Sequence, residues 1–258
     1  HQKDHFDALH MLGIVTHQLG NSDEACELVS RALNIRPDNA EAHNSLAIIL
    51  SSLTRSVEAL KHLDRALDLR PDFPEALNSK GNALRANGAL ASARDHFERA
   101  IELAPNYGQA HGSLGVVLIE MEEPEAAKTS LKNALRLTPG DPKIWSNLGA
   151  ALQDLGEFDE ALISINKALE LDANHAHAIN NRGHVLQELD KLTEAEASFL
   201  EAIRLQPIYA DAYINLGLTQ QMQNRLGEAI LTLKSGLKAE PNNPDLHWNL
   251  SLALLQNG

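Results

Sequence analysis

The chain has 258 residues, of which 43% are hydrophobic and only 4% are aromatic, so we expect a core built from aliphatic side chains. Its 35 acidic residues outnumber its 22 basic residues and give a formal net charge of −13. This balance argues against nucleic acid and against an anionic membrane surface as partners, because both are bound through basic patches.

Cys26 is the only cysteine, which excludes an intrachain disulfide and a thiolate metal cluster and favours a reducing compartment such as the cytoplasm. No apolar run approaches the roughly 18 residues that cross a bilayer, and we find no signal-peptide pattern. Since the sequence begins with His1 and not with methionine, we expect it to be a piece of a longer or processed protein.

A repeat of 34 residues runs through the chain without an insertion or a deletion. A small residue recurs at this spacing, at Gly13, Ala47, Gly81, Gly115, Gly149, Gly183, Gly217 and Ser251. An alanine follows each of the first seven after twelve residues, at Ala25, Ala59, Ala93, Ala127, Ala161, Ala195 and Ala229. The spacing predicts seven repeats and a half repeat in one domain over 1–258, with limits at 6–39, 40–73, 74–107, 108–141, 142–175, 176–209, 210–243 and 244–258.

Each repeat is predicted to contain two helices, and the fifth repeat illustrates the order. An apolar stripe with helical spacing comes first, at Ile144, Leu148, Ala151 and Leu155. A short break follows at Gly156, and a second stripe then begins at Ala161. In the other repeats a proline ends the second helix, because proline cannot continue a helix.

The recurring small residues are expected where two helices touch, since they let the helix axes approach at the short end of the ~8–10 Å range. One such hairpin cannot bury its own apolar face, so neighbouring hairpins must stack. The predicted fold is therefore an all-α solenoid of antiparallel helix pairs, with the first helices along one face and the second helices along the other.

Two kinds of departure from the repeat are expected to alter it locally. Ala173 takes the place of the recurring proline, which predicts that the helix before it frays or extends. Four residues take the place of the loop glycine and are expected to shift that turn: Thr54, Glu122, Asp190 and Asn224.

This pattern resembles the tetratricopeptide repeat family over essentially the whole chain. The resemblance implies a right-handed superhelix that binds peptides or proteins in its concave groove. The recurring "NLG" and the ending "PDLHWNLSLALLQNG" also look like the repeat arms of bacterial glycosyltransferases similar to O-linked N-acetylglucosamine transferase. In that family, asparagines on the concave face hold the backbone of the substrate protein.

A polar stripe lies beside the apolar stripe of the first helices and is predicted to face the groove. Its most regular feature is a ladder of asparagines spaced by 34 residues, at Asn147, Asn181, Asn215 and Asn249. An amide both donates and accepts hydrogen bonds, so such a ladder suits the backbone of an extended peptide. The alternative is that each asparagine bonds only a neighbouring helix or water. The equivalent positions in the N-terminal half are mostly serines, so we expect tighter binding in the C-terminal half.

Further groove-side candidates are Asn180, His184 and Trp248, the last as an aromatic anchor. The family's clamp for chaperone C-termini is not expected, because no lysine holds its first position. The residues found there are His10, Asn44, Asn78, Gly112, Ser146, Asn180 and Ile214.

No catalytic, cofactor-binding or metal-binding residues are predicted. One repeat position holds His43, His111 and His247, and in the fifth repeat it holds Trp145. This recurrence indicates ordinary packing and not a metal site. No nucleophile with an adjacent base stands out, and the glycine spacing is that of the repeat.

The sequence therefore predicts a non-catalytic scaffold that binds a protein or an extended peptide. The alternative is the substrate-recognition arm of a larger glycosyltransferase, which residues beyond Gly258 would distinguish. Leu246, Leu250, Ala253 and Leu254 are expected to form an uncovered apolar face that permits end-to-end self-association.

Overall fold

The computed structural model describes residues 5–256, and within this range every regular element is an α-helix. The helices are α1 (Phe6–Gln18), α2 (Ser22–Ile35), α3 (Ala40–Ser52), α4 (Ser56–Leu69), α5 (Pro74–Ala86), α6 (Leu90–Leu103), α7 (Gly108–Glu120), α8 (Pro124–Leu137), α9 (Pro142–Asp154), α10 (Phe158–Leu171), α11 (Ala176–Glu188), α12 (Leu192–Leu205), α13 (Ala210–Met222), α14 (Leu226–Ala239) and α15 (Pro244–Gln256). The predicted all-α solenoid of helix pairs is confirmed. None of these helices is long and apolar enough to cross a membrane.

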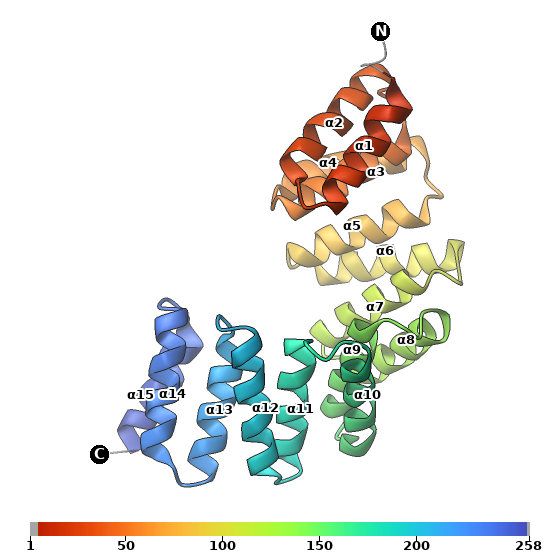
Figure 1. Cartoon of the computed structure of the whole chain (residues 1–258). Helices are drawn as coiled ribbons and strands as arrows, with labels where there is room; N and C mark the ends of the chain where they lie inside the picture. Colours follow the sequence, from red (N-terminus) through yellow and green to blue (C-terminus); the bar gives the residue numbers. More distant parts are fainter. Residues whose placement is uncertain (1–4, 257–258) are drawn as a thin grey trace. The chain divides into compact units, whose positions relative to one another are not determined.

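The chain divides into two compact units, His1–Leu137 and Thr138–Gly258. The first unit contains α1 to α8 and the second contains α9 to α15, and in each unit the helices stack in chain order (Figure 1). A single solenoid with the repeat limits given above stays a prediction.

Within each unit the first helices of successive repeats contact one another, as α1, α3, α5 and α7 do in the first unit. Inside a unit, a second helix contacts the first helix of its own repeat and that of the next, and no two second helices in the described part of the same unit make such a contact. Because the first helices approach one another more closely, they lie on the inner side of each unit. This inner row carries the polar stripe predicted above.

The recurring glycines lie where the two helices of a repeat touch, as expected. A Cβ atom built on Gly81 would lie 2.5 Å from the ring of Phe97, which is fully buried. At Gly149 the same atom would collide with the side chain of Ile165. Glycine therefore permits a close approach at these positions that even alanine would disturb.

The turn between the helices of a repeat keeps its left-handed conformation whatever residue occupies it, with a small change in φ. The glycines at this site have φ values of 89° at Gly20 and 76° at Gly88, and Thr54 has 58°. Both Gly20 and Thr54 donate their backbone N–H to the carbonyl three residues earlier, at 2.9 and 3.1 Å. The expected shift of the turn is therefore a lower φ, which is 57° to 60° at all four residues that replace glycine. These residues adopt the left-handed conformation because the helices on both sides hold it.

The expectation that Ala173 frays or extends its helix is wrong. The second helix of this repeat, α10, ends at Leu171, at the same repeat position as the other second helices. Asp172 then leaves the helix with extended φ and ψ of −143° and 95°. Its carboxylate accepts a hydrogen bond of 3.0 Å from the backbone N–H of Asn174. This Asx turn ends the helix where proline does so in other repeats.

In five repeats, a histidine, tryptophan or tyrosine near the start of the first helix donates a side-chain hydrogen bond to the loop before that helix. The side chain donates to the carbonyl of the residue six positions earlier, a proline each time, over 2.8 to 3.3 Å. The donors are His43, His111, Trp145, Tyr213 and His247. This contact is the packing role that the recurring histidines were predicted to have.

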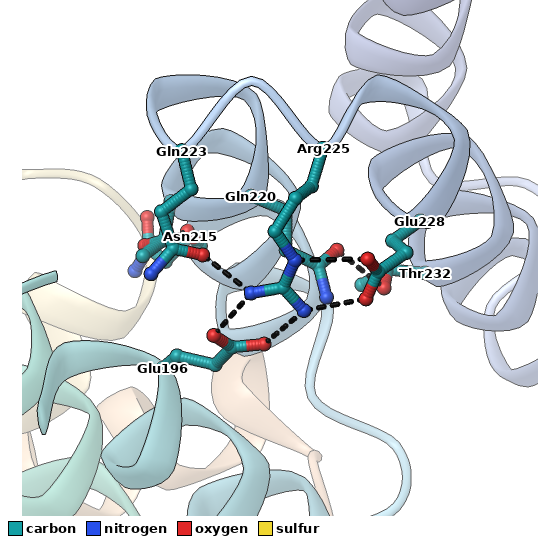
Figure 2. A network of polar contacts seen from close by, with 8 residues as sticks. Glu196, Asn215, Gln220, Gln223, Arg225, Glu228 and Thr232 are labelled. Carbon is teal, nitrogen blue, oxygen red and sulfur yellow. Dashed lines mark hydrogen bonds and ion pairs between the residues drawn. The ribbon is translucent and has the colours of Figure 1, made fainter. Parts of the chain in front are cut away.

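Two ion pairs join successive repeats beside the turns, one between Arg94 and Glu123 in the first unit and one between Arg225 and Glu196 in the second. The pair in the second unit is the more extensive. Arg225 precedes α14 and places its guanidinium between Glu196 of α12 and Glu228 of α14 (Figure 2). Two nitrogens of Arg225 contact the two oxygens of Glu196 at 2.6 and 3.0 Å. These hydrogen bonds hold the pKa of the Glu196 carboxyl below its ordinary value.

The last helix packs more of its apolar surface than was expected. Leu246 and Ala253 are fully buried against the preceding hairpin, so they do not belong to an uncovered face. Leu254 is exposed as expected and Leu250 is partly buried. The other exposed apolar side chains of α15 are those of Trp248, Leu252 and Leu255. Leu246 and Ala253 lie about two helical turns apart on one face of α15, and this face packs against the preceding hairpin.

Candidate functional site

The four asparagines of the predicted ladder lie at equivalent places on α9, α11, α13 and α15, and all are half-buried. Their bonding differs. Asn215 donates a hydrogen bond of 3.3 Å to Asn180 of the neighbouring first helix, and Asn249 donates to the backbone carbonyl of Asp245 at 2.8 Å. Asn147 and Asn181 form no side-chain hydrogen bond within residues 5–256.

The contact between Asn215 and Asn180 has a counterpart in the first unit. His10 and Ser45 occupy the same two repeat positions there, and their side chains lie 2.9 Å apart. In both cases the two residues are 35 positions apart. At Asn215 the ladder side chain therefore faces the preceding first helix, which places part of the predicted binding surface in an internal hydrogen bond.

The other candidates of the second unit have different surroundings. Asn180 is buried, whereas Trp248 is 66% exposed. The Nδ1 atom of His184 is buried without a hydrogen-bond partner. Burial raises the pKa of the nearby Asp154 carboxyl above its ordinary value, and His184 opposes this rise.

Two hollows indent the row of first helices in the first unit. The first hollow has a volume of about 480 Å³ and is lined from α1, α3 and α5, with His10, Glu41, Asn44 and Glu75 among its residues. The second hollow, of about 470 Å³, is lined mainly from α3 and α5 and by Tyr107 and Gln109. Asn44 and Glu75 line both hollows.

Two asparagines of the hollows are unusual in their hydrogen bonding. Asn44 and Asn78 are each only 8% exposed, and the side-chain oxygen of each is buried without a partner. A buried acceptor without a donor costs about 1–3 kcal/mol, so such groups are rare in folded proteins. Asn78 lines the second hollow and Asn44 lines both.

The carboxylates of this face differ in whether an arginine neutralises them. Arg70 contacts Glu41 at 2.7 Å, and its guanidinium also lies over the ring of Phe73 at 3.4 Å from the centroid. Arg99 contacts Asp72 at 3.1 Å. Glu75 forms no ion pair within the described residues, and its side chain is exposed.

Tyr107 closes one side of the second hollow. Burial raises the pKa of its phenol above the ordinary value, the charge of Glu75 raises this pKa further, and the Asn78 side chain lowers it. All three side chains line this hollow. The phenol also donates a hydrogen bond of 3.2 Å to the Gln109 side chain.

Asn44 and Asn78 were not predicted to be site residues. Their positions were noted as places where the lysine of the chaperone clamp is absent. A signal was nevertheless present, because the same position holds Asn180 in the second unit, one residue before the ladder. That these two side chains are buried without a partner follows from packing and could not be read from the spacing.

Comparison with known families decides what kind of repeat this is. Models described as tetratricopeptide repeat match residues 4–72, 45–108, 108–141, 142–175 and 180–244.

The chain belongs to the tetratricopeptide repeat family.

Solved structures agree with this assignment, although no curated protein matches the chain. The match to a structure of the APC/C hetero-tetramer Cut9–Hcn1 covers 93% of this chain, with a TM-score of 0.82 at 20% identity. The match covers 47% of that protein, so our chain spans about half its length. A tetratricopeptide repeat protein from Parabacteroides merdae matches 96% of this chain and 98% of its own, with a TM-score of 0.75 at 16% identity. At these identities the likeness concerns the fold alone.

YrrB is more similar in sequence, at 28% identity, and is described as a tetratricopeptide repeat protein with an unusual peptide-binding site. The match covers 72% of this chain and 96% of YrrB, with a TM-score of 0.56.

Proposed function

We propose that this tetratricopeptide repeat chain is a non-catalytic scaffold that binds an extended segment of a protein along its row of first helices. The main support is the set of asparagine side chains that recurs along this row, since amides can pair with both groups of a peptide bond. The peptide-binding site named for YrrB is consistent with this role. Cytoplasmic localisation and end-to-end association through α15 stay predictions.

The bonding of the asparagines refines the proposal. Asn147 and Asn181 have amides without internal hydrogen bonds among the described residues, whereas Asn215 and Asn249 must exchange internal partners to bind a peptide. Because the net gain from a hydrogen bond depends on what it replaces, the first two should contribute more affinity. Packed helices lie about 8–10 Å apart and an extended chain rises about 3.3 Å per residue, so one repeat spans about three residues of the peptide.

The test is a peptide selection followed by affinity measurements. A random library of peptides of about 12 residues is selected on the whole chain, and the strongest binder is labelled and titrated by fluorescence polarisation. Substitution of Asn147 and Asn181 by alanine should weaken binding about tenfold. Alanine at Asn215 and Asn249 should weaken it less.

Asn34 and Asn166 provide the matched control, because both are exposed on second helices. Alanine at these two positions should leave affinity unchanged, and circular dichroism should show equal helicity in all variants. Equal affinity of the Asn147/Asn181 variant and the wild type would remove the support for backbone recognition by the ladder.

The alternative function is that of a substrate-recognition arm in a larger glycosyltransferase. It would use the same face and the same asparagines, so the experiment above does not separate it from a free-standing scaffold. The sequence of the complete protein does, since a catalytic region beside the repeats is required for the alternative.

A further inference from the structure

The second hollow combines features that call for a ligand that donates hydrogen bonds. Asn44 and Asn78 line it, and each has a buried side-chain oxygen that no group of the described chain satisfies. Both oxygens are buried, so a ligand donor would remove this deficit once the amides turn toward the hollow, whereas an anion or another acceptor would not. These two oxygens therefore favour a ligand that carries hydrogen-bond donors.

The charge of the hollow specifies the ligand further. Glu75 is the only ionisable acid among the lining residues, and no lysine, arginine or histidine of the described chain lines the hollow. The carboxylates on the same face have arginine partners, as Glu41 has Arg70, but Glu75 has none within the described residues. An unpaired carboxylate next to unsatisfied acceptors attracts a cation that carries several N–H donors.

The remaining walls suit the stem of a long side chain. Ile48 lines the hollow and is 44% exposed, and Tyr107, which also lines it, is half-buried. Lysine and arginine bury their methylene stems on apolar surface while the charged end stays with polar groups. The volume of about 470 Å³ is within the usual range of small-ligand sites.

We infer that the second hollow binds an arginine or lysine side chain of the partner, with Glu75, Asn44 and Asn78 as the recognising groups. This inference rests on the proposed function and gives the two units different roles in binding the partner. The asparagines of the second unit recognise peptide backbone, and the hollow of the first unit selects a positive charge. The expected partner segment is therefore basic, which also fits the net charge of −13.

The first experiment does not require a binding peptide. Blocked arginine (Nα-acetyl-arginine N-methylamide) is titrated into the whole isotopically labelled chain, and the side-chain amide signals of Asn44 and Asn78 are followed by NMR. Blocked norleucine has a similar stem without the charge. We expect arginine to shift both amide signals and norleucine to leave them in place. Equal shifts with both probes would overturn the inference.

Glu75→Gln should weaken the arginine titration about tenfold, since it removes the only charge of the hollow. Asp211→Asn is the matched control, because Asp211 is exposed at the same repeat position in the second unit. It changes the net charge by the same amount and should have no effect. An equal loss in both variants would show general electrostatic attraction and would contradict a specific site.

The second experiment uses the peptide library and separates the two proposals. Wild-type chain should enrich arginine or lysine at one position of the bound peptides, and Glu75→Lys should replace this preference by aspartate or glutamate. Binding without any charge preference would overturn the inference and leave the scaffold function intact. An arginine-specific NMR shift without any bound peptide would support the hollow and contradict the scaffold function.

Discussion

At the residue scale, the turn between paired helices shows how neighbouring elements can impose a conformation on an unsuitable residue. Thr54 has a φ of 58°, in the left-handed region that a β-branched residue rarely occupies. Glycine adopts this region without steric cost, and asparagine tolerates it. Thr54 must therefore store strain that Gly88 does not.

Thr54→Gly should raise the free energy of unfolding by about 0.5–1 kcal/mol, because the relieved strain exceeds the added entropy of the unfolded chain. The measurement is urea unfolding followed by circular dichroism. Gly88→Thr is the reciprocal variant. A Cβ atom at Gly88 meets no atom within 4 Å, so a loss there would report the conformation alone.

Asn224→Gly supplies a control at the same repeat position, where φ is 60°. It should change stability little, since asparagine already tolerates the left-handed region. The idea of stored strain would be wrong if the Thr54 and Asn224 variants gained the same stability.

The residues that departed from the repeat show what a sequence can predict at this scale. Helix contacts followed from the spacing, because glycine at Gly81 and Gly149 has few reasons to recur other than close packing. The left-handed conformation of Thr54 and the unchanged helix end before Ala173 could not be predicted, since the conformation of a loop residue depends on the elements that hold it. Hydrogen bonding of Asn44 and Asn78 depends on neighbours in adjacent repeats, which no local pattern reveals.

At the element scale, two junctions between successive repeats carry ion pairs of opposite polarity. Arg225 lies before α14 and pairs with Glu196, whereas Glu123 lies before α8 and pairs with Arg94 at 3.1 Å. These are equivalent positions with the charges exchanged. The junction therefore accepts an ion pair in either direction. It does not require one, because Ala89 and Leu60 hold the same two positions in another pair of repeats.

This equivalence predicts the outcome of a charge exchange. Arg225→Glu should lower the urea midpoint, because it places a third carboxylate beside Glu196 and Glu228. Adding Glu196→Arg should recover part of the loss by restoring the pair in the opposite direction. Recovery should be incomplete, since the carboxylate introduced at position 225 would still face Glu228.

Arg204→Glu is the control for this exchange, because Arg204 pairs only with Glu201 of its own helix among the described residues, at an exposed site. It should lower the midpoint less than Arg225→Glu does. A double variant no more stable than Arg225→Glu alone would show that the ion pair does not join the repeats.

At the scale of the whole molecule, half-buried histidines in both units make stability depend on pH. Burial lowers the pKa of His10, His62 and His175 below 6.5. The contact of His62 with His43, at 2.9 Å between Nδ1 atoms, adds charge repulsion and lowers the pKa of His62 further. The unfolded chain therefore binds more protons than the folded chain as the pH falls through about 6.5.

We expect stability to be constant above about pH 7 and to fall as the pH decreases through about 6.5, until the lowered pKa values are passed. Carboxylates such as Glu196, whose pKa is lowered, lose their contribution only nearer pH 4.5. Urea midpoints at about pH 7.5 and about pH 5.5 separate the two effects. Asp154 acts in the opposite direction, since its pKa is raised.

His62→Gln isolates one contribution, because glutamine can still donate to His43 but does not titrate. This variant should show a smaller decrease between the two pH values than the wild type. An unchanged decrease would mean that the pair of His43 and His62 does not cause the effect.

The opposite polarity of these two junctions also limits how such a chain can be rearranged during evolution or by design. Duplication of a 34-residue block preserves every helix and every turn, so the backbone alone would allow repeats to be inserted or reordered freely. A block that brings Glu123 next to Glu196, however, would place two carboxylates together where an ion pair belongs. Repeats with the same backbone are thus not interchangeable, and their order along the gene is constrained by which charges each one presents to the next.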